Sequence, residues 1–255
     1  MRAIILAAGS GLRLDQHTKD VPKALLDLNG KSILERQISL LREHGVNEIF
    51  VVTGYKREKH VLKDIEYIFN PRYSETEQLA SMMVARTKIS DDVLVIFGDI
   101  VFDGQILQQI LASNDDIAMA IDLNWEKSYN DGLCNSHPLD EPVLINQKKV
   151  LRISYKQTDT MIENQTVGEF LGVIKLSANG SRTIIKKYEE LEKSHVGRFH
   201  DANSLEKAKL VDILQELIDS KIEISPITIG GKWCEIDTPK DLERARKIFQ
   251  NIDAG

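Results

Sequence analysis

The fold that this chain can adopt is constrained most by short apolar runs that stop abruptly at small or acidic residues. The run at residues 4–6 is followed at once by Ala-Ala-Gly-Ser-Gly, and the run at residues 93–97 by Gly-Asp. Uninterrupted runs of this length are typical of strands that are buried on both faces, as in a parallel sheet. Parallel strands present functional groups at their carboxyl ends, which meet at one edge of the sheet. We therefore expect an α/β protein with a site at that edge.

The apolar periodicity predicts an alternation of strands and helices in the first half of the chain. Strands are predicted at residues 4–6, 48–54, 67–69, 92–97 and 117–121, and helices at 32–43, 60–64, 77–87 and 105–112. Beyond residue 125, strands are predicted at 143–145, 150–155 and 170–176, and helices at 177–192, 204–220 and 240–249. This alternation predicts a mostly parallel sheet flanked by helices on both faces.

Charge and composition exclude several classes of protein. The 39 acidic residues outnumber the 33 basic ones and give a net charge of −6, which argues against nucleic acid as the main partner. The two cysteines, Cys134 and Cys234, are expected to be reduced thiols. No stretch is long and apolar enough to span a membrane, and no signal-peptide pattern opens the chain. We expect a cytoplasmic protein without a membrane partner.

The loop after the first strand is a candidate phosphate-binding loop. Its glycines allow the backbone to approach a ligand closely, and Arg13 adds a forked cation suited to phosphate. It lacks the third glycine of the dinucleotide fingerprint and the lysine of the Walker motif, so a purely structural turn is the alternative. The candidate loop residues are Leu6, Ala7, Ala8, Gly9, Ser10 and Gly11.

The loop continues into a wider pattern. Pro22-Lys23-Ala-Leu-Leu follows it, and Gly30-Lys31 precedes a predicted helix. This pattern resembles the opening of the nucleotidyltransferases that join a nucleoside triphosphate to a phosphorylated acceptor, and the resemblance covers nearly the whole chain. It implies a Rossmann-like mixed sheet of the nucleotide-diphospho-sugar transferase type. It also implies one domain over residues 1–255, with a nucleotide-binding half (1–122) and an acceptor-binding half (123–255).

The same resemblance assigns catalytic and metal-binding roles. It implies that Arg13 and Lys23 neutralise the triphosphate, although a solvated surface lysine is the alternative for Lys23. Gly98-Asp99 ends a predicted strand; both residues are expected to contact the nucleotide, and the family's matching aspartate holds Mg²⁺. Glu235 and Asp237 are two residues apart and share a strand face, which makes them candidates for the other metal ligands. Alternatively, Asp237 or Thr238 caps the following helix.

Two segments bear on the base and the acceptor. Thr76-Glu-Gln-Leu-Ala-Ser81 resembles a base-binding segment of the family, in which Gln78 and Ser81 would contact the nucleotide; an ordinary helix-surface glutamine is the alternative for Gln78. The sugar-1-phosphate members carry Ile-Xaa-Glu-Lys where this chain has Ile-Ser-Tyr-Lys156. The resemblance thus keeps Lys156 as a phosphate-binding and catalytic cation, and the missing glutamate argues against a sugar acceptor.

Four further segments look most like the cytidylyltransferases of phosphonate and phospho-alcohol metabolism, including those linked to phosphoenolpyruvate phosphomutase. They are residues 97–103, 122–125, 168–177 and 232–237. The acceptor-binding candidates are Trp125, Tyr129, Lys156 and Glu169, and unranked candidate anion contacts are Arg152, Lys175 and Arg198. An aromatic pair that only packs a loop is the alternative for Trp125 and Tyr129.

We therefore expect a Mg²⁺-dependent cytidylyltransferase that transfers CMP from CTP to a small phosphonate, phosphocholine or phospho-amino-acid acceptor and releases pyrophosphate. The alternative is a sugar-1-phosphate nucleotidyltransferase that uses UTP, dTTP or GTP. A nucleotide-binding protein without turnover is a third hypothesis, which the loss of Arg13, Lys23 or the aspartates would have favoured. A homodimer, the commonest assembly of soluble proteins, is expected.

Overall fold

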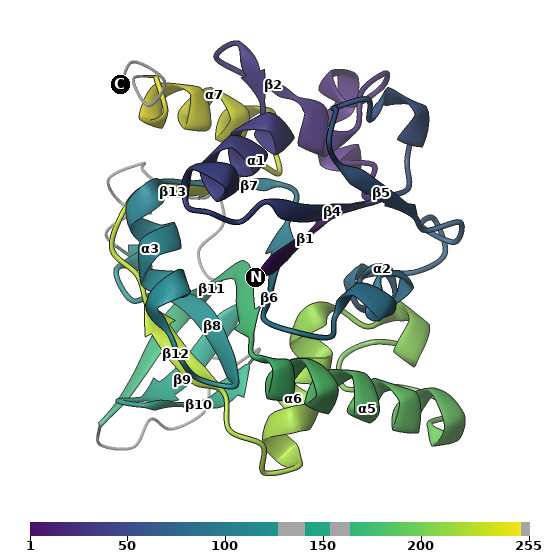
Figure 1. The fold of residues 1–255 in the computed structure, drawn as a ribbon, viewed down its shortest axis with the longest axis vertical. Helices are drawn as coiled ribbons and strands as arrows, with labels where there is room; N and C mark the ends of the chain where they lie inside the picture. The colour runs from purple at the N-terminus through teal and green to yellow at the C-terminus, as the bar shows by residue number, and fades with distance from the viewer. Residues whose placement is uncertain (127–140, 154–163, 251–255) are drawn as a thin grey trace.

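The computed structural model describes residues 1–126, 141–153 and 164–250, and its core is a mixed sheet (Figure 1). The strands of this sheet are β1 (Arg2–Ala7), β4 (Glu48–Thr53), β5 (Glu66–Phe69), β6 (Val93–Phe97), β8 (Ile117–Asp122), β9 (Pro142–Asn146), β10 (Lys149–Ile153), β11 (Gln165–Leu176) and β12 (Ser225–Thr228). Within the described residues these nine strands follow the order β10-β9-β11-β6-β1-β4-β5, with β8 paired to β11 and β12 to β8.

The direction of the strands differs between the two halves of the sheet. β1 is parallel to both β4 and β6, and β4 is parallel to β5. Every residue of β1 except Arg2 and Leu6, and every residue of β6, is buried, as expected for parallel strands covered on both faces. β11 is antiparallel to β6, β8 and β9, and it joins the parallel part to the rest. The predicted fold class, a mixed Rossmann-like sheet with helices on both sides, is confirmed.

Helices cover both sides of the parallel strands. They are α1 (Ile33–Glu43), α2 (Gln78–Val84), α3 (Gly104–Ala112), α5 (Ala178–Ser194), α6 (Leu210–Asp219) and α7 (Pro239–Ile248). Figure 1 shows α1 and α7 on one side of β1 and β4, and α2, α5 and α6 on the other. α1 begins with a capping box between Ser32 and Glu35, which satisfies backbone N–H groups of the first turn. Among the helices of the described segments, none is long and apolar enough to cross a membrane.

Two helix predictions were wrong. In place of a helix at 60–64, a 3-10 turn occupies Arg57–Lys59, and Asp64 adopts a left-handed backbone (φ 59°) that a right-handed helix cannot contain. The predicted helix at 204–220 is interrupted, because Ala208 and Lys209 are extended. The carbonyl of Ala208 accepts a hydrogen bond from the N–H of Leu79 (3.2 Å) and so docks this segment on the start of α2. The helix predicted at 77–87 ends at Val84, and a 3-10 turn follows at Arg86–Lys88.

The candidate site is positioned by very short strands, which the periodicity did not predict. β7 (Ile100–Phe102) pairs antiparallel with β13 (Trp233–Glu235), and β2 (Asp27–Leu28) pairs with β3 (Lys31–Ser32). A second hydrophobic cluster packs around them, separate from the main core. Its fully or nearly fully buried members include Leu14, Leu26, Leu28, Ile33, Val101, Cys234, Ile236 and Leu242. This cluster fixes the loop after β1 against the segment that follows β13.

Two further expectations concern the cysteines and the division of the chain into two halves. Cys234 is a buried free thiol, and burial raises its pKa to about 12, so it stays protonated; Cys134 lies outside the described residues. The main sheet continues without a break from β6 into β11, so the division into a nucleotide-binding and an acceptor-binding half at residue 122 stays a prediction.

Candidate active site

The loop after β1 forms one wall of a cavity of about 760 Å³. Gly11 has a left-handed backbone (φ 65°), and a Cβ at this position would lie 3.0 Å from the Cβ of Lys23, so only glycine fits here without strain. The carbonyl of Gly11 accepts hydrogen bonds from the N–H of Leu14 and the hydroxyl of Thr18, both at 2.9 Å. The loop therefore has a fixed shape and holds Lys23 close beneath it.

Most of the predicted nucleotide contacts line this cavity. They are Leu6, Ala8, Gly9, Ser10, Gly11, Arg13, Lys23, Gln78, Ser81 and Asp99. Ala7 and Gly98 do not line it, although both are described. Gly98 donates its N–H to the carbonyl of Leu6 (2.9 Å), and a Cβ there would lie 2.8 Å from the same carbonyl oxygen. The lack of a side chain lets β6 approach β1, and the nucleotide contact at Gly98 stays a prediction.

The far wall of the cavity includes Tyr55, Tyr73 and Ser74, which the sequence analysis missed, and also Thr76 and Glu77 from the base-binding segment that it singled out. The buried side chain of Asn70 donates hydrogen bonds to the hydroxyls of Thr76 and Ser81, both at 3.1 Å. Gln78 accepts a hydrogen bond from the N–H of Leu210 (3.3 Å), which ties α2 to α6. The polar groups facing the cavity from α2 are thus held in place by neighbours behind them.

Asp99 lies in a tight turn between β6 and β7. The carbonyl of Asp99 accepts a hydrogen bond from the N–H of Ile236 (2.9 Å), so the turn is joined directly to the segment after β13. From α1, the buried amide of Gln37 donates hydrogen bonds to the carbonyls of Phe97 (2.8 Å) and Ile100 (2.7 Å), on either side of the turn. These contacts fix the direction in which the Asp99 carboxylate points.

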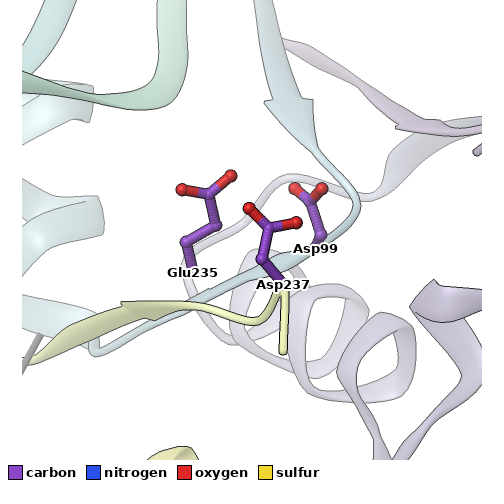
Figure 2. A group of neighbouring side chains, drawn as sticks. All are labelled: Asp99, Glu235 and Asp237. Carbon is purple, nitrogen blue, oxygen red and sulfur yellow. The ribbon is translucent and has the colours of Figure 1, made fainter. Parts of the chain in front are cut away.

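Glu235 and Asp237 come from the end of β13 and the residues after it. One carboxylate oxygen from each of Asp99, Glu235 and Asp237 lies within 4.8 Å of the others, and Figure 2 shows the three side chains reaching one region. Thr238, not Asp237, is the N-cap of α7, and Asp241 completes a capping box with it. The alternative that Asp237 caps α7 is therefore wrong. The cap at Thr238 instead fixes the backbone next to Asp237.

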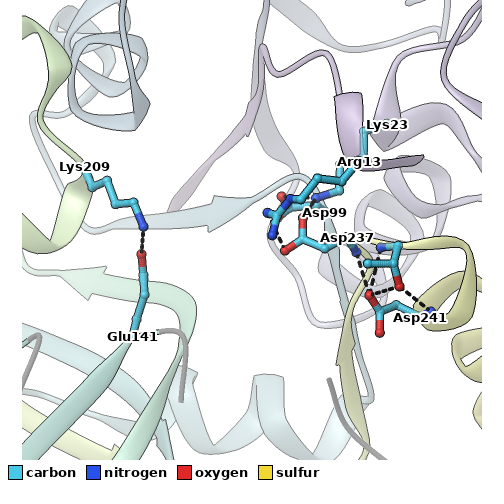
Figure 3. A network of polar contacts seen from close by, with 8 residues as sticks. Arg13, Lys23, Asp99, Glu141, Lys209, Asp237 and Asp241 are labelled. Carbon is cyan, nitrogen blue, oxygen red and sulfur yellow. Dashed lines mark hydrogen bonds and ion pairs between the residues drawn. The ribbon is translucent and has the colours of Figure 1, made fainter. Parts of the chain in front are cut away.

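Two cations contact this carboxylate group (Figure 3). The Nζ of Lys23 lies 2.8 Å from Oδ2 of Asp99 and also contacts Oδ1 of Asp237. Nη2 of Arg13 lies 2.7 Å from Oδ2 of Asp237. Lys23 is nearly buried, with 10% of its side chain exposed, so it is not a solvated surface lysine.

The electrostatics of the group follow from burial and mutual proximity. Burial alone would lower the pKa of Lys23, but the Asp99 and Asp237 carboxylates outweigh it and raise that pKa above its ordinary value. Burial, with the negative charges of Asp99 and Asp237, raises the pKa of Glu235 well above its usual range. The two aspartate carboxylates thus balance Lys23 and Arg13, and the raised pKa of Glu235 favours its protonated form.

The carboxylate oxygens fit a hard divalent cation. Oδ1 of Asp99 is buried and has no hydrogen-bond partner within the described part of the chain, which is costly for a carboxylate unless a cation faces it. Carboxylate oxygens from two or three residues are the protein ligands that Mg²⁺ prefers, with water and phosphate completing its shell. Asp99, Asp237 and Glu235 are the residues that would hold it.

A second cavity, of about 300 Å³, adjoins the first at Arg13, Gln78 and the carboxylate group. Glu169, a predicted acceptor contact, lines it. So do Glu141 and Lys209, which the sequence analysis missed and whose side chains are 3.4 Å apart (Figure 3). No local pattern marks either residue, because only the folding of distant strands brings them here.

The other acceptor candidates that the structure describes lie elsewhere. Trp125 donates its indole N–H to the carbonyl of Val167 (3.3 Å) and lines neither cavity. Nζ of Lys175 binds the carbonyls of Leu111 (2.9 Å) and Ser113, so this lysine is a structural cation and not an anion contact. Two further candidates, Arg152 and Arg198, line neither cavity. The last two, Tyr129 and Lys156, lie outside the described residues.

Comparison with known proteins decides the family. Residues 3–158 match the family described as the MobA-like NTP transferase domain. The chain belongs to this family. Two relatives match over nearly its whole length: the CTP:phosphoglutamine cytidylyltransferase of Campylobacter jejuni (29% identity, covering 95% of this chain and 98% of the relative) and the choline-phosphate cytidylyltransferase of Streptococcus pneumoniae (32%, covering 98% and 99%).

A solved structure with a similar fold is the inositol-1-phosphate CTP transferase from T. maritima. It superposes with a TM-score of 0.72 at 23% identity and covers 98% of this chain and 96% of its own. The comparisons confirm the expected resemblance to the nucleotidyltransferases and identify the chain as an enzyme of that class. Glu235 and Asp237 lie beyond the matched residues 3–158, so their place in the site comes from the structure.

Proposed function

We propose that this protein is a Mg²⁺-dependent cytidylyltransferase that transfers CMP from CTP to the phosphate or phosphonate of a small acceptor. The observation that carries the proposal is the meeting of a glycine-rich loop, two cations and three carboxylates at the junction of two cavities. The cytidylyl specificity is supported by the two relatives named for CTP or for choline-phosphate cytidylyl transfer.

The reaction needs charge neutralisation and alignment more than proton transfer. An oxygen of the acceptor anion attacks the α-phosphorus of CTP, the bond to the β-phosphate oxygen breaks, and pyrophosphate leaves. That oxygen is already ionised near neutral pH, so no general base is required. Arg13 and Lys23, together with N–H groups of the loop, would bind the phosphates and stabilise the charge on the leaving group.

Asp99, Asp237 and Glu235 would hold the divalent cation between the two cavities. When bound there, it would neutralise phosphate charge and draw electron density from the α-phosphorus. Gln37 and the cap at Thr238 would keep the Asp99 and Asp237 carboxylates in position. Lys156 stays a predicted acceptor contact.

The acceptor cavity favours a molecule with a positively charged group besides its phosphate or phosphonate. Among the described residues that line it, six are acidic and two are basic: Glu77, Asp99, Glu141, Glu169, Glu235 and Asp237 against Arg13 and Lys209. A cationic group such as an amine would be attracted there, while a second carboxylate on the acceptor would meet like charge. Among candidate acceptors, phosphocholine and 2-aminoethylphosphonate should therefore react better than phosphonoformate.

The test measures pyrophosphate release with Mg²⁺, using each of the four NTPs and dTTP against a panel of acceptors. The panel holds phosphocholine, 2-aminoethylphosphonate, phosphonoformate, a phosphorylated amino acid and several sugar 1-phosphates. We expect release with CTP and a non-sugar acceptor, and its loss in Asp99→Asn. Asp20→Asn, which removes an exposed carboxylate away from the cavities, is the matched control and should react like the wild type.

Release only with a sugar 1-phosphate and UTP, dTTP or GTP would replace the proposal by the alternative function. Release with CTP that persists after removal of divalent cations would refute the metal assignment but leave the cytidylyl transfer intact.

A further inference from the structure

The carboxylates that would hold the divalent cation are already bound to positively charged side chains of the protein. Lys23 bridges Asp99 and Asp237, which are supplied by segments far apart in the sequence, and Arg13 contacts the remaining oxygen of Asp237 (Figure 3). The Lys23 ammonium therefore occupies one oxygen of each of the two aspartates that would hold a metal ion. Both cannot make these contacts at once without strong repulsion between like charges.

Burial makes it unfavourable for Lys23 to leave Asp99 and Asp237 unless another anion takes their place. Only 10% of the side chain of Lys23 and 10% of that of Asp237 is exposed, so a displaced ammonium would stay in a poorly hydrated place without a counter-ion. Leaving such a charge unpaired is strongly unfavourable. Arg13 differs, because 62% of its side chain is exposed and it can turn into solvent. Lys23 is thus the cation that needs another anion before it can leave.

A triphosphate would supply that anion. Lys23 lines the larger cavity together with the glycine-rich loop, so the phosphates of a nucleotide bound there would lie within reach of its ammonium. The exchange keeps every buried charge paired, since Lys23 moves from carboxylate to phosphate while the carboxylates become available to a divalent cation.

We propose that Lys23 is the internal counter-ion of the free enzyme, and that it excludes divalent cations from Asp99 and Asp237 until a triphosphate draws it away. The inference rests on the proposed function of the site and deepens it, because it predicts that the metal ion enters together with the nucleotide and not before it. Arg13 supports the same state at Asp237.

The test is a titration of the nucleotide-free protein with Mn²⁺, followed by electron paramagnetic resonance of the free ion. Wild-type protein should bind Mn²⁺ weakly. Lys23→Met should bind it more tightly by about tenfold or more, because one positive charge is removed from the carboxylates. Lys19→Met removes an exposed lysine four positions away and should match the wild type. Adding Asp99→Asn to Lys23→Met should abolish the gain.

Equal or weaker Mn²⁺ binding by Lys23→Met would overturn the inference, as would tight binding by the free wild-type protein. Lys23→Gln is a second neutral variant with the same expectation, should Lys23→Met not fold by circular dichroism. The titration contains neither CTP nor acceptor, so its outcome is separable from that of the proposed function. If turnover needs Mg²⁺ but Lys23→Met shows no gain, only the counter-ion role fails; if turnover needs no metal, the proposed function fails first.

Discussion

Replacement of Gln37 tests whether the Asp99 turn must be held from behind. Gln37 is 2% exposed on α1, and its amide donates to the carbonyls of Phe97 and Ile100 on both sides of the turn. Gln37→Met keeps the length of the side chain and its helix propensity but removes both donors. The turn would then lose its link to α1 while keeping its hydrogen bond from Ile236.

The expected stability change is moderate. Each buried carbonyl that loses its donor costs about 1–3 kcal/mol, but Oε1 of Gln37 has no hydrogen-bond partner among the described residues, and its removal offsets part of the loss. A net loss of about 2 kcal/mol corresponds to a fall in Tm of roughly 4–8 °C for a chain of this length. A domain with about 5–15 kcal/mol of stability stays folded at room temperature.

The expected change in activity is larger. A shift of the Asp99 carboxylate by roughly 1 Å would reduce kcat/KM by roughly 10- to 100-fold and raise the Mg²⁺ concentration needed for half-maximal rate. Differential scanning calorimetry and Mg²⁺ titration of pyrophosphate release measure the two effects. Gln105→Met, on the exposed start of α3, is the matched control and should change neither. A Gln37→Met enzyme with wild-type Mg²⁺ dependence would refute the positioning argument, whatever its Tm.

Three further perturbations test other parts of the structure. Asp99→Asn should lower turnover by at least about 100-fold with little change in Tm, and near-normal Mg²⁺-dependent kinetics would remove Asp99 from the metal site. Burial lowers the pKa of His60 below its ordinary 6.5, so as the pH falls the unfolded chain is protonated first and the folded state loses stability below about pH 6.5. In urea titrations, the free energy of unfolding should therefore decrease more between about pH 7.5 and pH 5 in the wild type than in His60→Phe. Equal decreases in the two proteins would contradict this. Gly172→Ala places a Cβ against Phe97 at φ 81° and should lower the free energy of unfolding by about 2 kcal/mol more than Gly30→Ala does. Gly30 shares a positive φ (88°), but a Cβ there meets no described atom within 4 Å. Equal losses of stability in chemical denaturation would show that the clash is relieved.

The sequence predicted the elements whose pattern is local and long. The first strand, the helix at residues 32–43 and the strand before Asp99 were found because burial imposes a period or a run on their residues. The 60–64 and 204–220 helices failed because their backbone is set by contacts from elsewhere, such as the hydrogen bond between Leu79 and Ala208. Apolar spacing carries no record of such contacts.

The candidate site divides in the same way. The resemblance pointed to Arg13, Lys23, Asp99, Glu235 and Asp237, and the structure brings these five together. Gln37, Glu141 and Lys209 have no motif around them, since a glutamine on a helix or a glutamate before a strand is ordinary in sequence. Lys175 shows the opposite error, because a lysine in the acceptor half looked like an anion contact but binds backbone carbonyls.

The bond between Lys23 and Asp237 joins residues 214 positions apart, and it has a consequence for how activity arises during folding. β13 follows every strand of the main sheet in the chain, so the nascent protein would pass through a stage in which Asp237 has not yet joined Lys23 and Asp99. Contacts of such long sequence separation form late and slowly. Recovery of enzyme activity on refolding should therefore lag behind recovery of the sheet, and the lag would report the docking of residues 233–248.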